Sequence, residues 1–362
     1  MAWQFQFLLH DMYGRRLAPL HYESFSFSMS ANASTTLSLT LPLSEGADIT
    51  EYMLIEVWAS PGYGVALWPW DEYIVSNVAQ TIAVSGQRFY TLTAQDILRT
   101  LGGLVNRYAS KVWIGAADDY MRWTFRGNVM ADGPGDGSTD AGVRRRTPMF
   151  SLPISCEPDM ALGPKIQVTS PGGQLLGIMQ SAAKKAMQPA DGVIPGRPLF
   201  FDMYASQRNP LGFTFAVFPD QRGRDLTTHT PVILTANREI IKTEIEQDFS
   251  SEVNAVYYTA GTNQRVKVDT QRSLRAPFAR RESTAGTTLD SVTALRDGRI
   301  PLQVRGALVD TDYCVFGRDY WWGDAVLVNT GPRLLPMRLD TISISGDAAG
   351  NVQRGARFNL IQ

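Results

Sequence analysis

Strict alternation of apolar and small polar residues is the feature that most constrains the fold of this chain. Phe25, Phe27 and Met29 are separated by serines, and leucine recurs at every other position over 37–41 until Pro42 ends the run. Successive side chains of a β-strand point to opposite faces, so this period of two predicts strands with one buried face. Apolar stretches that suit strands recur near both ends of the chain, at 3–9, 53–58, 73–78, 89–93, 302–309, 325–328 and 335–344. The sequence therefore predicts a mainly β protein.

The strand-rich regions form two blocks with a different region between them. A chain of 362 residues is long enough for two or three domains. We expect two similar, tube-like β-barrel domains at residues 1–110 and 231–362, and a small α+β insert at 111–230. In the last long strand the apolar residues change from odd to even positions after Leu339, which a β-bulge near Asp340 would reconcile.

Three helices are expected between these strands. The first starts after Thr93, with Asp96 as its capping-box acid, and the second starts at Ser170 with Pro171 in its first turn. The third starts at Thr287 or Thr288 and ends before Gly298. Their apolar stripes are Leu98, Leu101, Val105 and Tyr108; then Leu175, Leu176, Met179, Ala182, Ala183 and Ala186; then Leu289, Val292 and Leu295. Residues 269–284 are expected to form a basic, irregular loop.

A segment rich in glycine and aspartate, residues 132–142, interrupts the middle region. It has no apolar anchor to offset the entropy of ordering it, so we expect a mobile loop. Asp132, Asp136 and Asp140 are candidate calcium ligands, but their spacing of four does not match the EF-hand loop. The arginines at 144–146 fit a solvated face, or a contact with phosphate or an acidic partner.

The stretch from Gly317 to Val328 begins with turn residues and ends in strand-like alternation. Asp319 and Asp324 bracket Gly323, and aspartate and glycine are residues that tight turns select. This pattern predicts a tight turn that leads into a strand. The alternative is a catalytic pair of carboxylates, although no second cluster of titratable residues lies nearby in the sequence.

The pattern of this stretch resembles the closing barrel of the tail hub proteins of long-tailed bacteriophages, a tail-tip family related to the baseplate hub of contractile-tailed phages. The residues that carry the resemblance are Gly317, Asp319, Tyr320, Gly323, Asp324 and Val326. Residues 248–256, which contain Asn254, resemble the segment that opens the second barrel in that family. Residues 37–42 resemble part of its first barrel, and 96–108 the helix that follows it. The region from 111 to 230 shows no such likeness.

The resemblance implies a structural virion protein without enzymatic activity and without a cofactor. Three copies would form a homotrimeric ring of six barrels, which joins the hexameric tail tube to the three-fold tail tip or fibre. The implied partners are the distal tail protein ring, central fibre or tail-tip proteins, the tape-measure protein, and DNA that passes through the lumen without specific binding. No membrane insertion is implied. The implied location is the tail tip or baseplate, after assembly in the host cytoplasm, and Asn254 and the six residues above would have structural or assembly roles.

Charge and cysteine content agree with this hypothesis. The chain has 34 basic and 35 acidic residues, so it lacks the electrostatic footprint of a nucleic-acid binder. Passage of DNA needs weak contacts, because each neutralised phosphate releases counterions and adds affinity. Cys156 and Cys314 are far apart and lack metal-binding spacing, so we expect a reduced protein, with a disulfide left open. We expect neither a secretory signal nor a membrane-spanning helix.

No catalytic, cofactor-binding or metal-binding residues are predicted. His10, His21 and His229 do not pair at metal spacing, and nucleotide-binding glycine loops and nucleophile elbows are absent. Asp118 and Asp119 could serve as the paired carboxylates of a glycoside hydrolase. They are a poor acid and base for this reaction, however, because neighbours on a strand point to opposite faces.

Two other functions stay open. One is a tail-tip enzyme that degrades cell wall or polysaccharide, which needs buried carboxylates of raised pKa in a cleft. The other is a carbohydrate- or receptor-binding module, which needs exposed aromatic side chains. The candidates for that surface are Trp68, Trp70, Trp321 and Trp322, with Trp68 and Trp70 in a turn-rich segment.

Overall fold

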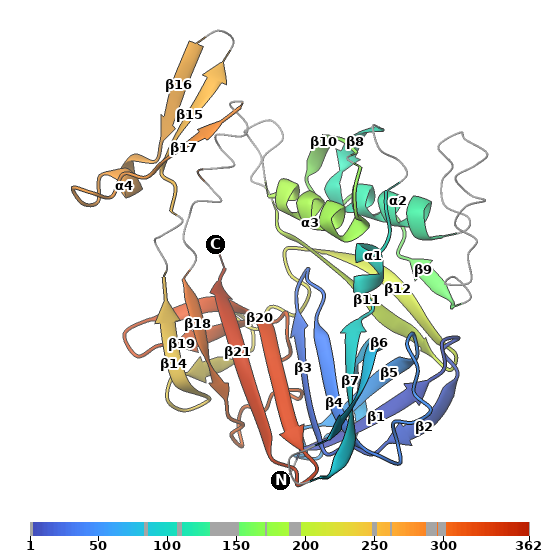
Figure 1. Cartoon of the computed structure of the whole chain (residues 1–362). Coiled ribbons are helices and arrows are strands. Elements are labelled where there is room, and N and C mark those ends of the chain that lie inside the picture. The colour runs from blue at the N-terminus through green and yellow to red at the C-terminus, as the bar shows by residue number, and fades with distance from the viewer. Residues whose placement is uncertain are drawn as a thin grey trace.

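The structure is a computed structural model of the whole chain (Figure 1). It describes residues 3–82, 86–106, 111–130, 152–170, 172–187, 197–247, 252–260, 263–286, 295 and 302–361. The expected loop at 132–142, the arginines at 144–146 and nearly all of the helix expected after Thr287 lie outside these residues. No helix in the described part of the chain is long and apolar enough to cross a membrane.

A large, mostly antiparallel sheet contains strands from both ends of the chain. Its N-terminal strands are β1 (Gln4–His10), β2 (Arg16–Leu20), β3 (Ser24–Ser30), β4 (Thr36–Pro42), β5 (Leu54–Ser60), β6 (Trp68–Ile82) and β7 (Arg88–Asp96). Its C-terminal strands are β13 (Ile233–Thr235), β14 (Ile240–Glu246), β18 (Gln303–Leu308), β19 (Ala325–Asn329), β20 (Leu334–Asp347) and β21 (Val352–Leu360). The strand order is β14-β18-β21-β20-β3-β4-β7-β6-β5-β1-β2, with β19 between β20 and β13. The prediction of a mainly β fold is confirmed.

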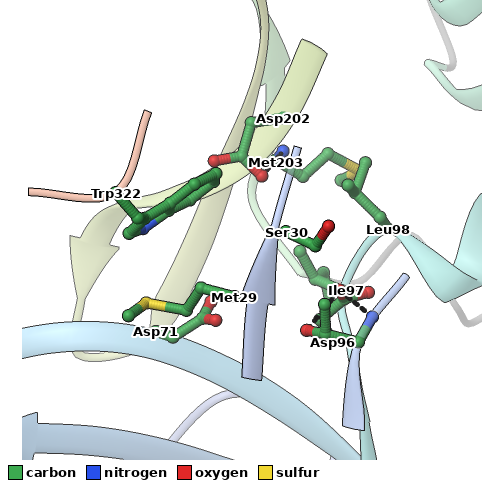
Figure 2. A pocket seen from close by; sticks show the side chains of 10 residues that line it. Met29, Ser30, Asp71, Asp96, Ile97, Leu98, Asp202, Met203 and Trp322 are labelled. Atoms are coloured by element: carbon green, nitrogen blue, oxygen red, sulfur yellow. Dashed lines mark hydrogen bonds between the residues drawn. The ribbon is translucent and has the colours of Figure 1, made fainter. Parts of the chain in front are cut away.

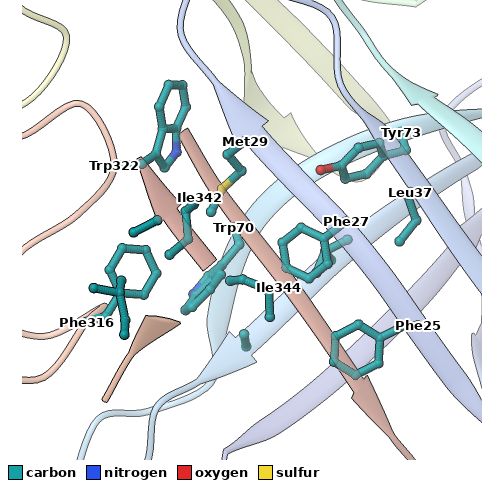
Figure 3. Close-up of a cluster of buried hydrophobic side chains, with 14 of the residues drawn as sticks. Phe25, Phe27, Met29, Leu37, Trp70, Tyr73, Phe316, Trp322, Ile342 and Ile344 are labelled. Carbon is teal, nitrogen blue, oxygen red and sulfur yellow. The ribbon is translucent and has the colours of Figure 1, made fainter. Parts of the chain in front are cut away.

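The two blocks of strands meet where β20 pairs with β3. Ile342 lies opposite Met29 and Ile344 opposite Phe27, and all four side chains are buried. Figure 3 shows these residues in one apolar cluster that also contains Phe316 from the C-terminal part. Strands β1–β7 and strands β13, β14 and β18–β21, from the two ranges expected to form separate barrels, thus share one hydrogen-bonded sheet and one continuous core.

The bulge expected near Asp340 is present. The register between β20 and β21 shifts between Leu339 and Thr341. Asp340 itself accepts hydrogen bonds from Arg338 and Asn359. The extra residue moves the buried positions of β20 from odd to even numbers, as the sequence pattern requires.

The middle region forms a second, α+β layer with its own core. Its elements are α1 (Arg99–Gly102), β8 (Val112–Ala116), α2 (Ala117–Val129), β9 (Ile154–Cys156), β10 (Lys165–Thr169), α3 (Leu175–Ala186), β11 (Leu199–Arg208) and β12 (Leu211–Pro219). Helices α2 and α3 pack over β11 and β12, and Phe125 stacks on Phe215 with ring centroids 4.3 Å apart. Figure 1 shows this layer above β5–β7.

The predicted helix boundaries in this layer were wrong, because the expected caps have other partners. Thr93 lies within β7. Helix α1 is a single turn, and the Arg99 amide donates a hydrogen bond to the Asp96 carboxylate. The Ser170 hydroxyl is held by Asn106 and Tyr120 and does not cap a helix, so α3 begins only at Leu175.

Helix α2 was missed by the sequence analysis. Asp118 and Asp119 lie in its first turn, not on a strand. Asp118 pairs with the buried guanidinium of Arg122 at 2.6 Å. A helix with buried charges on its inner face lacks a clear apolar stripe, which explains why the sequence pattern did not reveal it.

A third unit stands apart from both layers, and we call residues 252–285 the projecting unit. It contains β15 (Ala255–Ala260), β16 (Asn263–Val268), α4 (Thr270–Ser273) and β17 (Glu282–Ala285), with the strands ordered β16-β15-β17. The chain leaves the large sheet after β14 and returns at β18, and these two strands pair with each other. The expectation that Val253, Ala255, Tyr257, Val266 and Val268 belong to the second barrel was therefore wrong, and α4 and β17 replace much of the irregular loop expected at 269–284.

We predict that Ile342→Ala destabilises the whole large sheet in one cooperative transition. Ile342 is fully buried at the seam between β20 and β3, and such a truncation removes apolar contacts and leaves a cavity. The free energy of unfolding should fall by about 2–5 kcal/mol. Chemical denaturation followed by tryptophan fluorescence and circular dichroism measures it.

Ser343→Ala is the matched control, because Ser343 is the exposed neighbour of Ile342 on the same strand. It should change the unfolding free energy by less than about 0.5 kcal/mol. Two separate transitions in Ile342→Ala, with only the C-terminal part weakened, would contradict a shared core.

Candidate functional site

The stretch from Gly317 to Val328 forms the predicted turn, followed by β19. Gly317 and Gly323 both have positive φ values, +87° and +85°, which glycine adopts without strain. Asp319 accepts a hydrogen bond from the Val315 amide at 2.7 Å. The turn prediction is confirmed for this stretch.

Asp324 fixes a second loop against this turn. It is 1% exposed and accepts hydrogen bonds from the Trp321 amide at 2.8 Å and from the amide and guanidinium of Arg224. A side chain at Gly223 would collide with it, because a Cβ there would lie 2.3 Å from Asp324 Oδ1. Asp319 and Asp324 therefore both bind backbone amides, as structural carboxylates do, and they do not form a catalytic pair.

The structure brings six of the seven residues of the family pattern together and separates the seventh. Tyr320 and Val326 are buried in the large core beside the turn that contains Gly317, Asp319, Gly323 and Asp324. Asn254 lies in the projecting unit, where its side chain donates to the Ala279 carbonyl at 2.6 Å and accepts from the Arg281 amide at 2.8 Å. Their local contacts are structural, and their assembly role remains a prediction.

The tryptophans that a carbohydrate-binding surface would need pack against one another. Trp70 lies 4.5 Å from Trp321 between ring centroids, and Trp321 lies 4.9 Å from Trp68. Trp70 is only 8% exposed and Trp322 only 6%. Trp68 and Trp70, the best candidates for exposure, lie in strand β6, and the expected burial of most of these tryptophans in the aromatic core is confirmed for Trp70 and Trp322.

A cluster of carboxyl groups that the sequence analysis missed lies where the large sheet meets the α+β layer. Asp71, Asp96 and Asp202 line a small pocket together with Met29 and Trp322 (Figure 2). Their side chains come from β6, β7 and β11. The pocket has room for about one water molecule. N-terminal, middle and C-terminal residues meet here, and the pKa values of Asp71 and Asp96 are raised.

The surroundings of Asp71 favour its protonated form. The Tyr73 hydroxyl lies 3.0 Å from the Ser28 carbonyl and 2.9 Å from Asp71 Oδ2. One hydroxyl proton is shared between these two acceptors, and a proton on Asp71 would let the carboxyl group donate to Tyr73 and leave the hydroxyl proton for the Ser28 carbonyl. Burial, followed by the charges of Glu72, Asp96 and Asp202, raises the pKa of Asp71 well above its ordinary value. The geometry and the electrostatics agree.

Asp96 is also buried, but it has several donors. Its carboxylate accepts from the Thr35 hydroxyl at 2.9 Å and from the Thr35 amide. Burial raises the pKa of Asp96 to about 6, although these hydrogen bonds oppose the shift. The third carboxyl group, that of Asp202, pairs with Arg222, whose guanidinium stacks on Trp322 at 3.8 Å.

Beside this pocket, two glutamates share Arg208 from β11. Arg208 pairs with Glu56 at 2.7 Å and with Glu72, so it links the α+β layer to β5 and β6. Burial raises the pKa of Glu72 to about 7. Burial also opposes ionisation of Glu56, but hydrogen bonds from His10 and Arg208 and the charge of Arg208 outweigh it and lower the pKa of Glu56 to about 2.

The junction cluster partly meets the requirement for a hydrolase, namely buried carboxylates of raised pKa. A pocket for about one water molecule has no room for a sugar ring, however. Asp118 and Asp119, the other candidate carboxylates, have a structural role, since they accept hydrogen bonds from the backbone amides of residues 160–163. The arrangement joins two layers of the protein and offers no substrate cleft.

Metal and thiol chemistry find little support in the described residues. No group of three or more His, Cys, Asp or Glu side chains there is arranged to hold a metal ion, and the calcium candidates at 132, 136 and 140 lie outside these residues. Cys156 and Cys314 are both free, and burial raises the pKa of their thiols to about 11 and about 12.

The fold is that of phage tail proteins. The chain superposes on the tail protein from Neisseria meningitidis MC58 with a TM-score of 0.57 and 12% identity, over 98% of this chain and 96% of that one. For the 43 kDa tail protein of prophage MuSo2 from Shewanella oneidensis the TM-score is 0.56, with 10% identity over 99% and 98%. For the prophage tail protein gp18 from Listeria monocytogenes EGD-e it is 0.53, with 10% identity over 98% and 94%. The fold that the resemblance implied is confirmed.

Sequence comparisons add nothing to this result: no protein-family model and no curated protein matches the chain. What it shares with the solved tail proteins is the three-dimensional arrangement over nearly its whole length.

We predict that Asp71→Asn keeps the junction intact and flattens the dependence of stability on pH. The amide can donate to Tyr73 and accept from the Glu72 amide, as protonated Asp71 does. Because the raised pKa makes the folded chain hold a proton that the unfolded chain releases, wild-type stability should fall as the pH rises from 5 to 8. One such proton contributes a slope of up to about 1.4 kcal/mol per pH unit, and the variant should lose it.

The pKa values of Glu72 and Asp96 are also raised, so these groups also lower the stability as the pH rises, and some pH dependence should remain in the variant. Glu56 acts only at lower pH, because its stabilising effect is lost as the pH falls from about 4.5 towards 2. Glu23→Gln removes an exposed carboxyl group and serves as the control. Denaturation at pH 5, 6, 7 and 8 measures the effect, and a variant that is less stable than wild type at pH 8 would show that Asp71 is ionised.

Proposed function

We propose that this chain is a structural tail hub protein of a long-tailed bacteriophage. Three copies form a ring with pseudo-six-fold symmetry, which joins the hexameric tail tube, through the distal tail protein, to the three-fold tail tip or central fibre. The tape-measure protein and DNA leave through its lumen during infection. The observation that carries the proposal is the fold, which matches three tail proteins, two of them from prophages, over at least 94% of each chain.

The internal chemistry of the molecule supports a mechanical role. The residues of the Gly317–Val328 stretch are used for turns, for loop anchoring and for core packing. Arg208, Glu56 and Glu72 join the α+β layer to the large sheet through buried charges, which are costly to break one partner at a time. A part that transmits load between a tube and a tip needs such a fixed geometry.

The two alternative functions have less support. The pocket lined by Asp71, Asp96 and Asp202 holds about one water molecule, which is too small for the substrate of a tail-tip hydrolase. A carbohydrate-binding module would need exposed tryptophans, whereas Trp70 and Trp322 are at most 8% exposed. We therefore propose a role without catalysis, placed at the tail tip or baseplate of the virion.

We predict that the purified protein is a trimer in solution. Three copies of the 40.0 kDa chain give a particle of about 120 kDa, and closed cyclic symmetry stops assembly at three copies, so the particle should not grow further as the concentration rises. Sedimentation velocity and end-on electron-microscopy images measure this. A monomer at micromolar concentration, both alone and mixed with the distal tail protein, would overturn the ring.

We also predict that the protein retards duplex DNA little or not at all at moderate salt. The charge balance is near neutral, with 34 basic and 35 acidic residues, so few phosphates can be neutralised and few counterions released. A mobility-shift titration at two salt concentrations tests this. Tight binding that weakens steeply with salt would count against a passive conduit.

A further inference from the structure

The projecting unit exposes two large apolar side chains at one end. Leu274 follows α4 and is 79% exposed, and Phe278, four residues later, is 90% exposed. The unit buries few apolar residues, chiefly Ala255, Val256 and Ala279. Units of fewer than about 40 residues usually need a disulfide, a metal or a second chain for stability. Figure 1 shows the unit standing clear of the large sheet, so a partner surface has access to it.

The same unit has a marked excess of positive charge. Residues 252–285 contain six basic and three acidic side chains, a surplus of three positive charges, so the rest of the chain has a surplus of four negative charges. The three acids are used within the unit, because Glu252 pairs with Arg275, Asp269 with Arg272, and Glu282 with Arg280. The exposed cations outside these pairs are Arg265, Lys267 and Arg281.

A complementary surface lies on the large sheet, in the loop of residues 43–52 between β4 and β5, which we call the acidic loop. Its charged residues are Glu45, Asp48 and Glu51, with no basic residue among them. At its two ends Leu43 is 41% exposed and Tyr52 is 64% exposed. The loop thus combines three negative charges with two exposed apolar side chains, as the projecting unit combines cations with Leu274 and Phe278.

The acidic loop is held in place by the protein beneath it. Ile49 is 5% exposed and belongs to the large core, and the Tyr52 amide donates to the Val75 carbonyl at 2.9 Å. Tyr90 packs so closely on Gly46 that a Cβ there would lie 2.2 Å from the ring. A fixed loop loses little entropy when it binds, which makes it a suitable docking surface.

We propose that the projecting unit of one copy docks on the acidic loop of the neighbouring copy. This inference rests on the proposed trimer and names the contact that closes it. Phe278 and Leu274 pack against Leu43 and Tyr52, while Arg265, Lys267 and Arg281 face Glu45, Asp48 and Glu51. Because the two surfaces differ, the contact is heterologous, and such a contact repeated with a closing rotation gives a ring. The apolar residues supply most of the affinity, and the charges set register and partner choice.

Charge reversal on each surface, followed by a swap, tests the proposal. The unit variant is Arg265→Glu with Lys267→Glu, and the loop variant is Asp48→Lys with Glu51→Lys. Each variant should raise the protein concentration at which half of the chains are in trimers about tenfold or more. The two variants combined in one chain should restore this concentration to within about threefold of wild type. Phe278→Ser should raise it about 30-fold or more. Sedimentation velocity at 50 and 300 mM salt measures these values.

Matched controls separate this contact from general effects of charge. Arg88→Glu with Lys165→Glu reverses two exposed cations elsewhere and should leave assembly unchanged. Circular dichroism of all variants should match wild type, because every altered side chain is exposed. A chain with Lys267→Cys and Asp48→Cys should form covalent trimers with a short bismaleimide, while each single variant should give none, since the native thiols have raised pKa values.

The outcomes distinguish failure of this contact from failure of the hub proposal. A wild-type trimer that neither reversal weakens would overturn the docking contact and leave the trimer standing. Weakening by the unit variant alone, without rescue by the swap, would show that another partner covers the unit and would also overturn the contact. A wild-type chain that stays monomeric would overturn both.

Discussion

Pairing between β20 and β3 is the interaction on which the rest of the structure depends. It joins strands more than 300 positions apart in the chain into one sheet, with Ile342 opposite Met29 and Ile344 opposite Phe27. Over the paired stretches, 26–30 and 341–345, buried and more exposed positions alternate, so a slip of one residue would move the apolar side chains to the solvent face, and burial fixes the register. The junction pocket depends on the same seam, because Trp322 reaches it from the C-terminal part and Asp71 from the N-terminal part. The pairing of β20 with β3 thus helps to fix the position of the α+β layer on the large sheet.

Burial of carboxyl groups at this junction is unfavourable unless each is neutral or paired, and the structure uses both solutions. Burial raises the pKa of Asp71 well above its ordinary value and so favours its neutral form, in which it can donate to Tyr73. Glu56 is ionised and surrounded by His10, Arg16 and Arg208. Removing either layer would leave these groups without partners, so the cluster favours one relative placement of the layers over many. This is a role in specificity of assembly more than in net stability.

The strands and the bulge at Asp340 could be predicted from the sequence, because they depend only on local alternation. The start of α3 could not, since Ser170 has the composition of a helix cap but binds Asn106 and Tyr120, which are distant in sequence. The junction cluster was missed for the same reason: its carboxyl groups come from three strands. One signal was present, however. Asp71 and Glu72 lie in the middle of a strand that is otherwise rich in aromatic residues, and acids in a strand interior usually mark a special contact.

The near-zero net charge conceals a polarised chain. Charge balance over the whole sequence predicts that this is not a typical nucleic-acid binder, yet it hides a surplus of three positive charges in residues 252–285 against four negative charges elsewhere. The strand topology reveals this separation of charge. Strands β14 and β18 pair with each other, so the projecting unit between them is an insertion into the large sheet. An insertion that is basic, has a small core and exposes Phe278 is poorly suited to exist alone. The same polarity that would make two copies attract head to tail also makes two like ends repel, and this directs association towards a closed ring and away from random aggregates.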